Sequence, residues 1–159
     1  MVEIHYSLNA DLNPLFQVSI KLQLDEQVGR ILEAVDRCGY GKNTIVVYTA
    51  DHGLALGSHG LLGKQNVYEH SMGCPLVVRG PGIPAGQSTS ALTCLLDLFP
   101  TLCGYAGVEV PEGIDGHDLR QVFEGTQESV RESIFLAYQD KMRTIRDDAL
   151  KLHVYPEIN

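Results

Sequence analysis

Residues 44–69 read TIVVYTADHGLALGSHGLLGKQNVYE, and this stretch decides the fold. It opens with the β-branched apolar run 44–49, which follows the turn residues 41–43. A continuous apolar run is typical of a strand buried on both faces, as in a parallel sheet covered by helices. Ala50 and then Asp51 and His52 follow that run. Because ligands bind at the carboxyl ends of strands in open α/β sheets, we expect both side chains at a binding edge.

A carboxylate and an imidazole side by side suit a divalent cation, so Asp51 and His52 are the candidate metal ligands. Four glycines between positions 53 and 63 keep the following loop close to this edge, and His59 and Lys64 project from the loop. Each residue also has a plainer interpretation. The Asp-His pair fits a turn and helix cap, His59 a solvated loop histidine, and Lys64 a surface lysine. The strand-end position, the glycine spacing and the lysine together favour a site.

The segment YTADHGLALGSHGLLGKQNVYEHSMGCPLVVRGPGIPAG, residues 48–86, resembles the downstream half of the sulfatase family, within the alkaline-phosphatase-like superfamily. The resemblance extends over residues 24–155 and is strongest in the D-H-G…G-x-H-G…K…Y-E block. It implies that Asp51 and His52 match two metal ligands, usually for calcium. It also implies that Lys64 matches the catalytic lysine that contacts the sulfate ester. His59 lies in the matching loop as a candidate substrate contact, whereas His70 is expected to be structural.

The sequence departs from the family pattern at the nucleophile. Sulfatases carry a cysteine in an upstream C-x-P-S-R type motif, which is converted to formylglycine. None of the four cysteines, at positions 38, 74, 94 and 103, has this context. The remaining acidic metal ligands also come from the upstream half of the family, which nothing before Leu24 resembles. We therefore expect the C-terminal portion of a sulfatase, inactive by itself, with formylglycine only in an upstream segment.

Bulk composition excludes several classes of protein. The chain has 159 residues, 44% of them hydrophobic, which is enough for one globular core. Its formal net charge of −8 argues against nonspecific binding of nucleic acid. No apolar run approaches the length of a membrane span. No secretory signal is visible at residues 1–11, although the resemblance implies a periplasmic, secreted or lysosomal location.

The remaining pattern predicts an α/β fold: part of a mainly parallel sheet covered by helices, followed by a small antiparallel C-terminal piece. We expect irregular structure at 1–15, helices at 16–38, 98–106 and 118–124, and strands at 44–49, 75–79 and 89–95. Gly39 and Gly107 are expected to end the two longer helices, and Asp97 to cap the second.

Three sequential strand candidates at 133–138, 142–146 and 150–155 indicate an antiparallel meander. We therefore divide the chain into residues 1–125, the downstream half of a catalytic α/β domain, and residues 126–159, the first part of a small antiparallel C-terminal subdomain. An exposed sheet edge would also allow self-association.

Three functions fit this sequence. The first is metal-assisted hydrolysis of sulfate monoesters, with a sulfated small molecule or glycan as the substrate. A metal and Lys64 would then offset the charge of the anionic ester. The second is a phosphonate or phosphodiester hydrolase of the same superfamily, which shares the D-H-G…G-K pattern. The third is a non-catalytic remnant or binding module.

Overall fold

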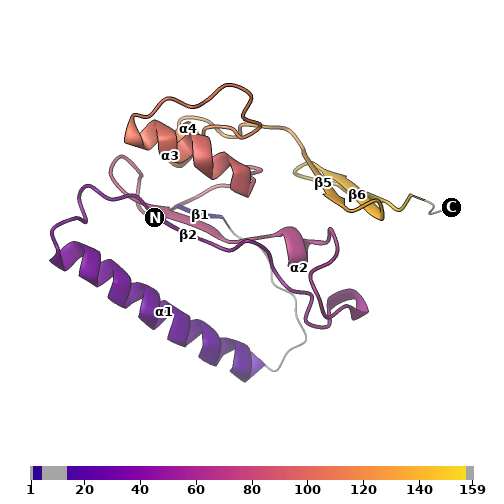
Figure 1. Cartoon of the computed structure of the whole chain (residues 1–159). Coiled ribbons are helices and arrows are strands. Elements are labelled where there is room, and N and C mark those ends of the chain that lie inside the picture. Colours follow the sequence, from indigo (N-terminus) through magenta and orange to yellow (C-terminus); the bar gives the residue numbers. More distant parts are fainter. Residues whose placement is uncertain (1, 5–13, 157–159) are drawn as a thin grey trace.

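The computed structural model of the chain describes residues 2–4 and 14–156, which form a four-stranded sheet, a three-stranded sheet and the helices around them (Figure 1). The larger sheet has the order β2-β3-β1-β4. Its strands are β1 (Val2–Ile4), β2 (Val46–Thr49), β3 (Leu76–Arg79) and β4 (Gln87–Ser88). The smaller sheet has the order β5-β6-β7, with β5 at Ile134–Tyr138, β6 at Met142–Arg146 and β7 at Lys151–Val154.

The pairing within the larger sheet corrects one part of the sequence-based prediction. β3 runs antiparallel to both β2 and β1, and only β1 and β4 pair in parallel. The connection from β2 to β3 contains the site loop and the single turn α2 (Glu69–Met72) rather than a covering crossover helix. The chain therefore returns beside β2 in the opposite direction, as antiparallel neighbours do. The α/β architecture and the antiparallel C-terminal piece are confirmed.

The helices form layers on the two sides of the larger sheet (Figure 1). Helix α1 (Pro14–Arg37) lies on one side, and α3 (Leu98–Ala106) and α4 (Arg120–Phe123) lie on the other. The core lies between β3 and the layer formed by α3 and α4, where four buried side chains pack together: Leu76, Val78, Leu119 and Phe123. Among the described helices, none is long and apolar enough to cross a membrane.

Helix α1 has the predicted amphipathic pattern, but only part of its apolar face is covered. Val28, Leu32 and Val35 are half-buried, whereas Leu24 and Ile31 are 43% and 62% exposed. The helix ends as predicted before Gly39, which takes a φ of +80°. A left-handed residue at this place is the usual end of a helix, and glycine adopts it without steric cost.

Two predicted segments are wrong. Residues 2–4, expected to be irregular, form β1. Of the strand expected at 89–95, residues 89–94 form neither helix nor strand, and Leu95 begins the 3₁₀ turn η2 (Leu95–Asp97). The rest of the predicted lead-in at 5–13 lies outside the described residues. The other helices and strands form close to their predicted positions, because each has its own apolar periodicity or turn residues. The domain boundary at 126 stays a prediction.

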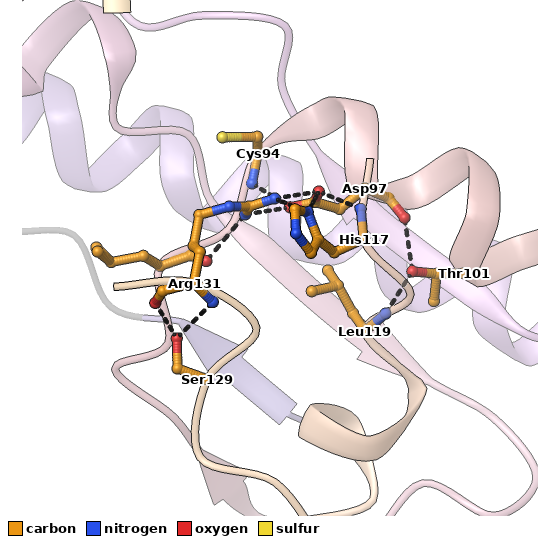
Figure 2. A network of polar contacts seen from close by, with 8 residues as sticks. Cys94, Asp97, Thr101, His117, Leu119, Ser129 and Arg131 are labelled. Carbon is orange, nitrogen blue, oxygen red and sulfur yellow. Dashed lines mark hydrogen bonds and ion pairs between the residues drawn. The ribbon is translucent and has the colours of Figure 1, made fainter. Parts of the chain in front are cut away.

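Asp97 does not cap α3 as predicted. Its backbone is helical, and its side chain makes no capping hydrogen bond to that helix. The carboxylate is fully buried and instead accepts hydrogen bonds from the backbone N–H groups of Cys94 and His117. It also forms a bidentate ion pair with Arg131 (Figure 2). Asp97 thereby joins η2, the segment before α4 and the segment that leads into β5.

Candidate functional site

The predicted metal ligands lie where β2 ends. Asp51 and His52 follow Thr49 after one alanine, and the Asp51 side chain is 83% exposed. The backbone N–H of His52 donates to Asp51 Oδ1 at 3.0 Å. Asp51 Oδ2 lies 3.2 Å from His52 Nε2. Because the carboxylate and the imidazole follow the strand in the sequence, two potential metal-ligand atoms, Asp51 Oδ2 and His52 Nε2, lie close together at the end of β2.

A backbone contact fixes how the His52 ring presents its nitrogens. Nδ1 lies 3.0 Å from the carbonyl oxygen of Gly53. Because a carbonyl can only accept, the neutral ring in this position carries its proton on Nδ1, and its Nε2 lone pair faces Lys64 Nζ. A backbone partner on the second ring nitrogen is the usual arrangement around a metal-binding histidine. Nε2 is therefore the ligand-type atom of His52.

Lys64 completes this group. Its Nζ contacts His52 Nε2, although the two residues stand twelve positions apart in the sequence. The lone pair of Nε2 and the negative Oδ2 of Asp51 would repel each other at their separation, and the ammonium group offsets that repulsion. The structure thus brings together Asp51, His52 and Lys64, which are three of the four predicted site residues.

Glycine and tight turns return the loop to the strand end. The N–H of Gly53 donates to the carbonyl of Ser71 at 2.9 Å, and a Cβ at this position would lie 2.0 Å from the carbonyl oxygen of His70. Only glycine permits this approach. Further along, Ala55 bonds to Gly63 at 3.0 Å across the loop, so Lys64 emerges beside the strand end.

The ring contacts of His59 are with Tyr68 and His70. His59 occupies the 3₁₀ turn η1 (Ser58–Gly60) with a φ of +54°, and its ring stacks on Tyr68 with a centroid distance of 4.6 Å and an interplanar angle of 12°. The His70 ring lies 5.6 Å from it. Burial, followed by the charges of His59 and Lys151, lowers the pKa of His70, and its structural role stays a prediction.

A cleft of about 220 Å³ opens beside the strand end, and its lining includes Asp51, His52, Ser71, Cys74 and Arg146. Burial, and then the negative charge of Asp51, raise the pKa of the Cys74 thiol. A thiol with a raised pKa is a poor nucleophile at neutral pH. The cleft therefore supplies room for a small group but no activated cysteine.

The donor set fits part of a divalent metal site. Asp51 and His52 offer one oxygen and one nitrogen donor, whereas calcium takes six to eight oxygen ligands. Within residues 2–4 and 14–156, no group of three or more His, Cys, Asp or Glu side chains is placed to hold a metal ion. The two residues would thus form one side of a site, with its other ligands supplied from elsewhere.

Sequence analysis missed the residues that tie this loop to the C-terminal sheet. Glu69 accepts a hydrogen bond from Lys151 Nζ at 2.7 Å and lies 2.9 Å from Arg146 Nη1. The hydroxyl groups of Tyr68 and Tyr155 lie 2.6 Å apart. The Y-E pair at 68–69 was visible in the sequence, but its partners stand more than seventy positions away and follow no local pattern.

The chain is similar to known sulfatases over the same region. A model of the sulfatase family matches residues 21–108. An N-acetylglucosamine-6-O-sulfatase of Bacteroides thetaiotaomicron is 43% identical over 104 residues, which are 65% of this chain and 19% of that protein. Arylsulfatase K of Bos taurus is 35% identical over 104 residues, with the same coverage of both chains. The chain thus spans about a fifth of the length of these relatives.

Solved structures show the same fold. A protein in complex with its substrate D-glucosamine-2-N,6-O-disulfate superposes with a TM-score of 0.75 at 35% identity, covering 84% of this chain and 30% of that chain. A phosphonate monoester hydrolase from Silicibacter pomeroyi gives a TM-score of 0.76 at 28% identity, covering 82% and 30%. Because the family match covers more than half of this chain, the chain belongs to the sulfatase family.

Proposed function

We propose that this chain supplies the metal-facing and sulfate-facing side of a sulfuric ester hydrolase. The observation that carries the proposal is the group formed by Asp51, His52 and Lys64 at the end of β2. It presents a carboxylate, an imidazole lone pair and an ammonium group within one contact network. Such a set suits an anionic ester, whose charge must be offset locally in a chain of net charge −8.

The three residues have distinct roles in this proposal. Asp51 Oδ2 and His52 Nε2 would hold a divalent cation, for which calcium is the family expectation. When bound, this cation would supply a Lewis acid for a sulfate oxygen. Lys64 would hold a sulfate oxygen as a point charge on a flexible stem, and would stabilise the negative charge that shifts during ester cleavage.

The nucleophile and the remaining ligands are proposed to come from residues that this chain does not contain. The four cysteines lack the formylglycine context, and the pKa values of Cys74 and Cys94 are both raised, first of all by burial. A formylglycine supplied by an upstream segment would accordingly face the group at the end of β2.

A sulfated amino sugar is the proposed substrate class. Two comparisons support it: the 43% identical relative is an N-acetylglucosamine-6-O-sulfatase, and one superposed protein binds a glucosamine disulfate. The second candidate is a phosphonate monoester, which the superposed phosphonate monoester hydrolases favour at 28% and 30% identity. The higher identity to sulfatases makes the sulfate ester our first choice.

The test uses a hybrid sulfatase, in which this chain replaces the matching region of the Bacteroides thetaiotaomicron relative. We expect the hybrid to release sulfate from N-acetylglucosamine-6-sulfate faster than it cleaves an aryl phosphonate monoester. Lys64→Ala should abolish most of that release, whereas Lys42→Ala, an exposed lysine in another turn, should leave it unchanged. A folded hybrid that releases no sulfate, or one that prefers the phosphonate, would overturn the proposal.

A further inference from the structure

Tyr68 lies at the centre of a group of aromatic rings outside the Asp51 site. Its ring stacks on His59 at 4.6 Å and lies 5.7 Å from His70 and 5.0 Å from His153. His59 and His70 belong to the site loop and to α2, whereas His153 belongs to β7. Tyr68 therefore lies between the loop and the C-terminal sheet and contacts both.

Tyr68 is held in position through its backbone and through its side-chain hydroxyl group. Its backbone N–H donates to Asn66 Oδ1 at 3.0 Å, and Asn66 is only 2% exposed. Its hydroxyl group lies 2.6 Å from that of Tyr155, the residue directly after β7. A ring held by its backbone, its ring contacts and its hydroxyl group has little freedom to rotate, so it presents a fixed surface to His59.

The C-terminal sheet is itself pinned against this position. Glu69 follows Tyr68 in the sequence, and its carboxylate binds Lys151 at 2.7 Å and Arg146 at 2.9 Å. Within the sheet, His153 Nδ1 lies 2.7 Å from the hydroxyl group of Thr144, which is 1% exposed. A shift of β7 relative to the loop would break contacts on both sides of Tyr68.

His59 depends on Tyr68 for its orientation. It is exposed at the tip of a turn, and the ring contacts recorded for it in the described part of the chain are those with Tyr68 and His70. An exposed histidine without a ring partner would sample several rotamers. The nearly parallel stack of 12° selects one ring plane.

We propose that Tyr68 is a positioning residue, which holds the His59 ring in place and makes that place depend on Tyr155 in the C-terminal sheet. The functional part of this inference rests on the proposed function, in which His59 contacts the substrate. The C-terminal sheet would then set the orientation of a substrate contact without touching the substrate. Sequence changes near Tyr155 would alter which sugar is accepted while the Asp51, His52 and Lys64 group stays intact.

The positioning is tested by NMR on this chain with ¹³C-labelled histidine. The six histidines give a small set of ring signals, and His59→Gln identifies the signal of His59. A ring stacked on tyrosine is shifted upfield by the ring current. We expect the shift to persist in Tyr68→Phe, which keeps the ring, and to disappear in Tyr68→Leu. In Tyr155→Phe the His59 signal should move or broaden, although Tyr155 is not one of the ring contacts of His59.

The matched control is Tyr40→Phe, which removes a hydroxyl group from an exposed tyrosine in the turn after α1. It should leave the His59 signal in place. A His59 signal unaffected by Tyr68→Leu would overturn the stack, and one unaffected by Tyr155→Phe would overturn the link to the C-terminal sheet. Neither result depends on catalysis, so failure of the sulfatase proposal would be seen separately in the hybrid protein.

The substrate part is read from the kinetics of the hybrid sulfatase. We expect His59→Ala and Tyr68→Leu each to raise KM several-fold, and the double variant to raise it no further than the larger single effect, because both act through one ring. Lys64→Ala should act on kcat instead. Multiplying effects in the double variant would show that Tyr68 does not act through His59.

Discussion

Both terminal nitrogens of Arg131 donate to the Asp97 carboxylate, one to each oxygen and both at 2.6 Å (Figure 2). The Asp97 side chain is fully buried, and that of Arg131 is 12% exposed. A second donor–acceptor chain runs from the same residue, because Thr101 Oγ1 donates to the Asp97 carbonyl and accepts from the Leu119 N–H. This network holds η2 and α3 against the segments on either side of α4.

Arg131→Leu should destabilise the chain strongly. It leaves a buried carboxylate without its counter-charge, which costs about 3–5 kcal/mol of the free energy of unfolding. The measurement is urea-induced unfolding. Arg79→Leu serves as the control, because Arg79 pairs with Asp36 near the surface and its side chain is 39% exposed. That pair should contribute at most about 1 kcal/mol. Equal losses in the two variants would contradict the assigned importance of burial.

The ion pair between Asp97 and Arg131 also predicts how the loss of unfolding free energy in Arg131→Leu depends on pH. Burial alone would raise the pKa of Asp97, but hydrogen bonds from Arg131 and from the His117 and Cys94 amides outweigh it, so the pKa lies below its usual value. The resulting stabilisation is present above about pH 4, where the unfolded carboxyl ionises, and is lost as the pH falls through the lowered folded value.

In Arg131→Leu the remaining burial should raise the pKa of Asp97, so acid should favour the folded variant. The difference in unfolding free energy between wild type and Arg131→Leu should therefore shrink as the pH falls from 7 towards about 3. The lowered pKa of Glu69 also costs stability in acid, but it affects both proteins equally and cancels in the comparison. A constant difference across this range would refute the linkage.

Lys64→Ala should affect turnover far more than folding. Lys64 is exposed, so its removal should leave the melting temperature of the hybrid sulfatase nearly unchanged. Its loss as an electrostatic contact should cost about 2–4 kcal/mol of transition-state stabilisation. The measurement is kcat for sulfate release beside the thermal unfolding curve. Wild-type kinetics in this variant would show that Lys64 does not contact the ester in the transition state.

Asp51→Ala should remove bound metal and activity together in the hybrid sulfatase. The carboxylate is one of the two proposed donors in the described part of the chain, and it is the negatively charged one. Elemental analysis of the purified protein measures metal content. Asp148→Ala removes an exposed carboxylate from the turn between β6 and β7 and should retain the metal. Full metal content in Asp51→Ala would show that Asp51 is not a ligand.

The sequence predicted the features that depend on neighbouring residues. The run 44–49 indicated β2, and the Asp51-His52-Gly53 triplet indicated a site at its end, because strand, ligands and tight turn are adjacent in the chain. The sequence did not predict the contacts that close the structure. Glu69 and Lys151 stand 82 positions apart, and Asp97 and Arg131 stand 34 apart. Neither pair has a periodicity of its own.

Two of the errors have the same physical origin. Asp97 precedes a helix and therefore fits a capping pattern, but its carboxylate is instead bound by Arg131 and by the N–H groups of Cys94 and His117, which lie outside that helix. The three residues of β1 are too few to show strand periodicity, and their pairing with β3 is decided by residues more than seventy positions away. Local patterns report local preference, which long-range pairing overrides.

This chain, purified alone, should not hydrolyse sulfate esters. It offers Asp51, His52 and Lys64 to an anionic ester, but none of its cysteines stands in the formylglycine context. The strand that carries the site, β2, is also an edge strand of the described sheet and presents unpaired backbone groups. The assay measures cleavage of an aryl sulfate with and without calcium, alongside the oligomeric state by sedimentation. Turnover above buffer that disappears in Asp51→Ala would contradict the prediction and would require a nucleophile among the residues of this chain.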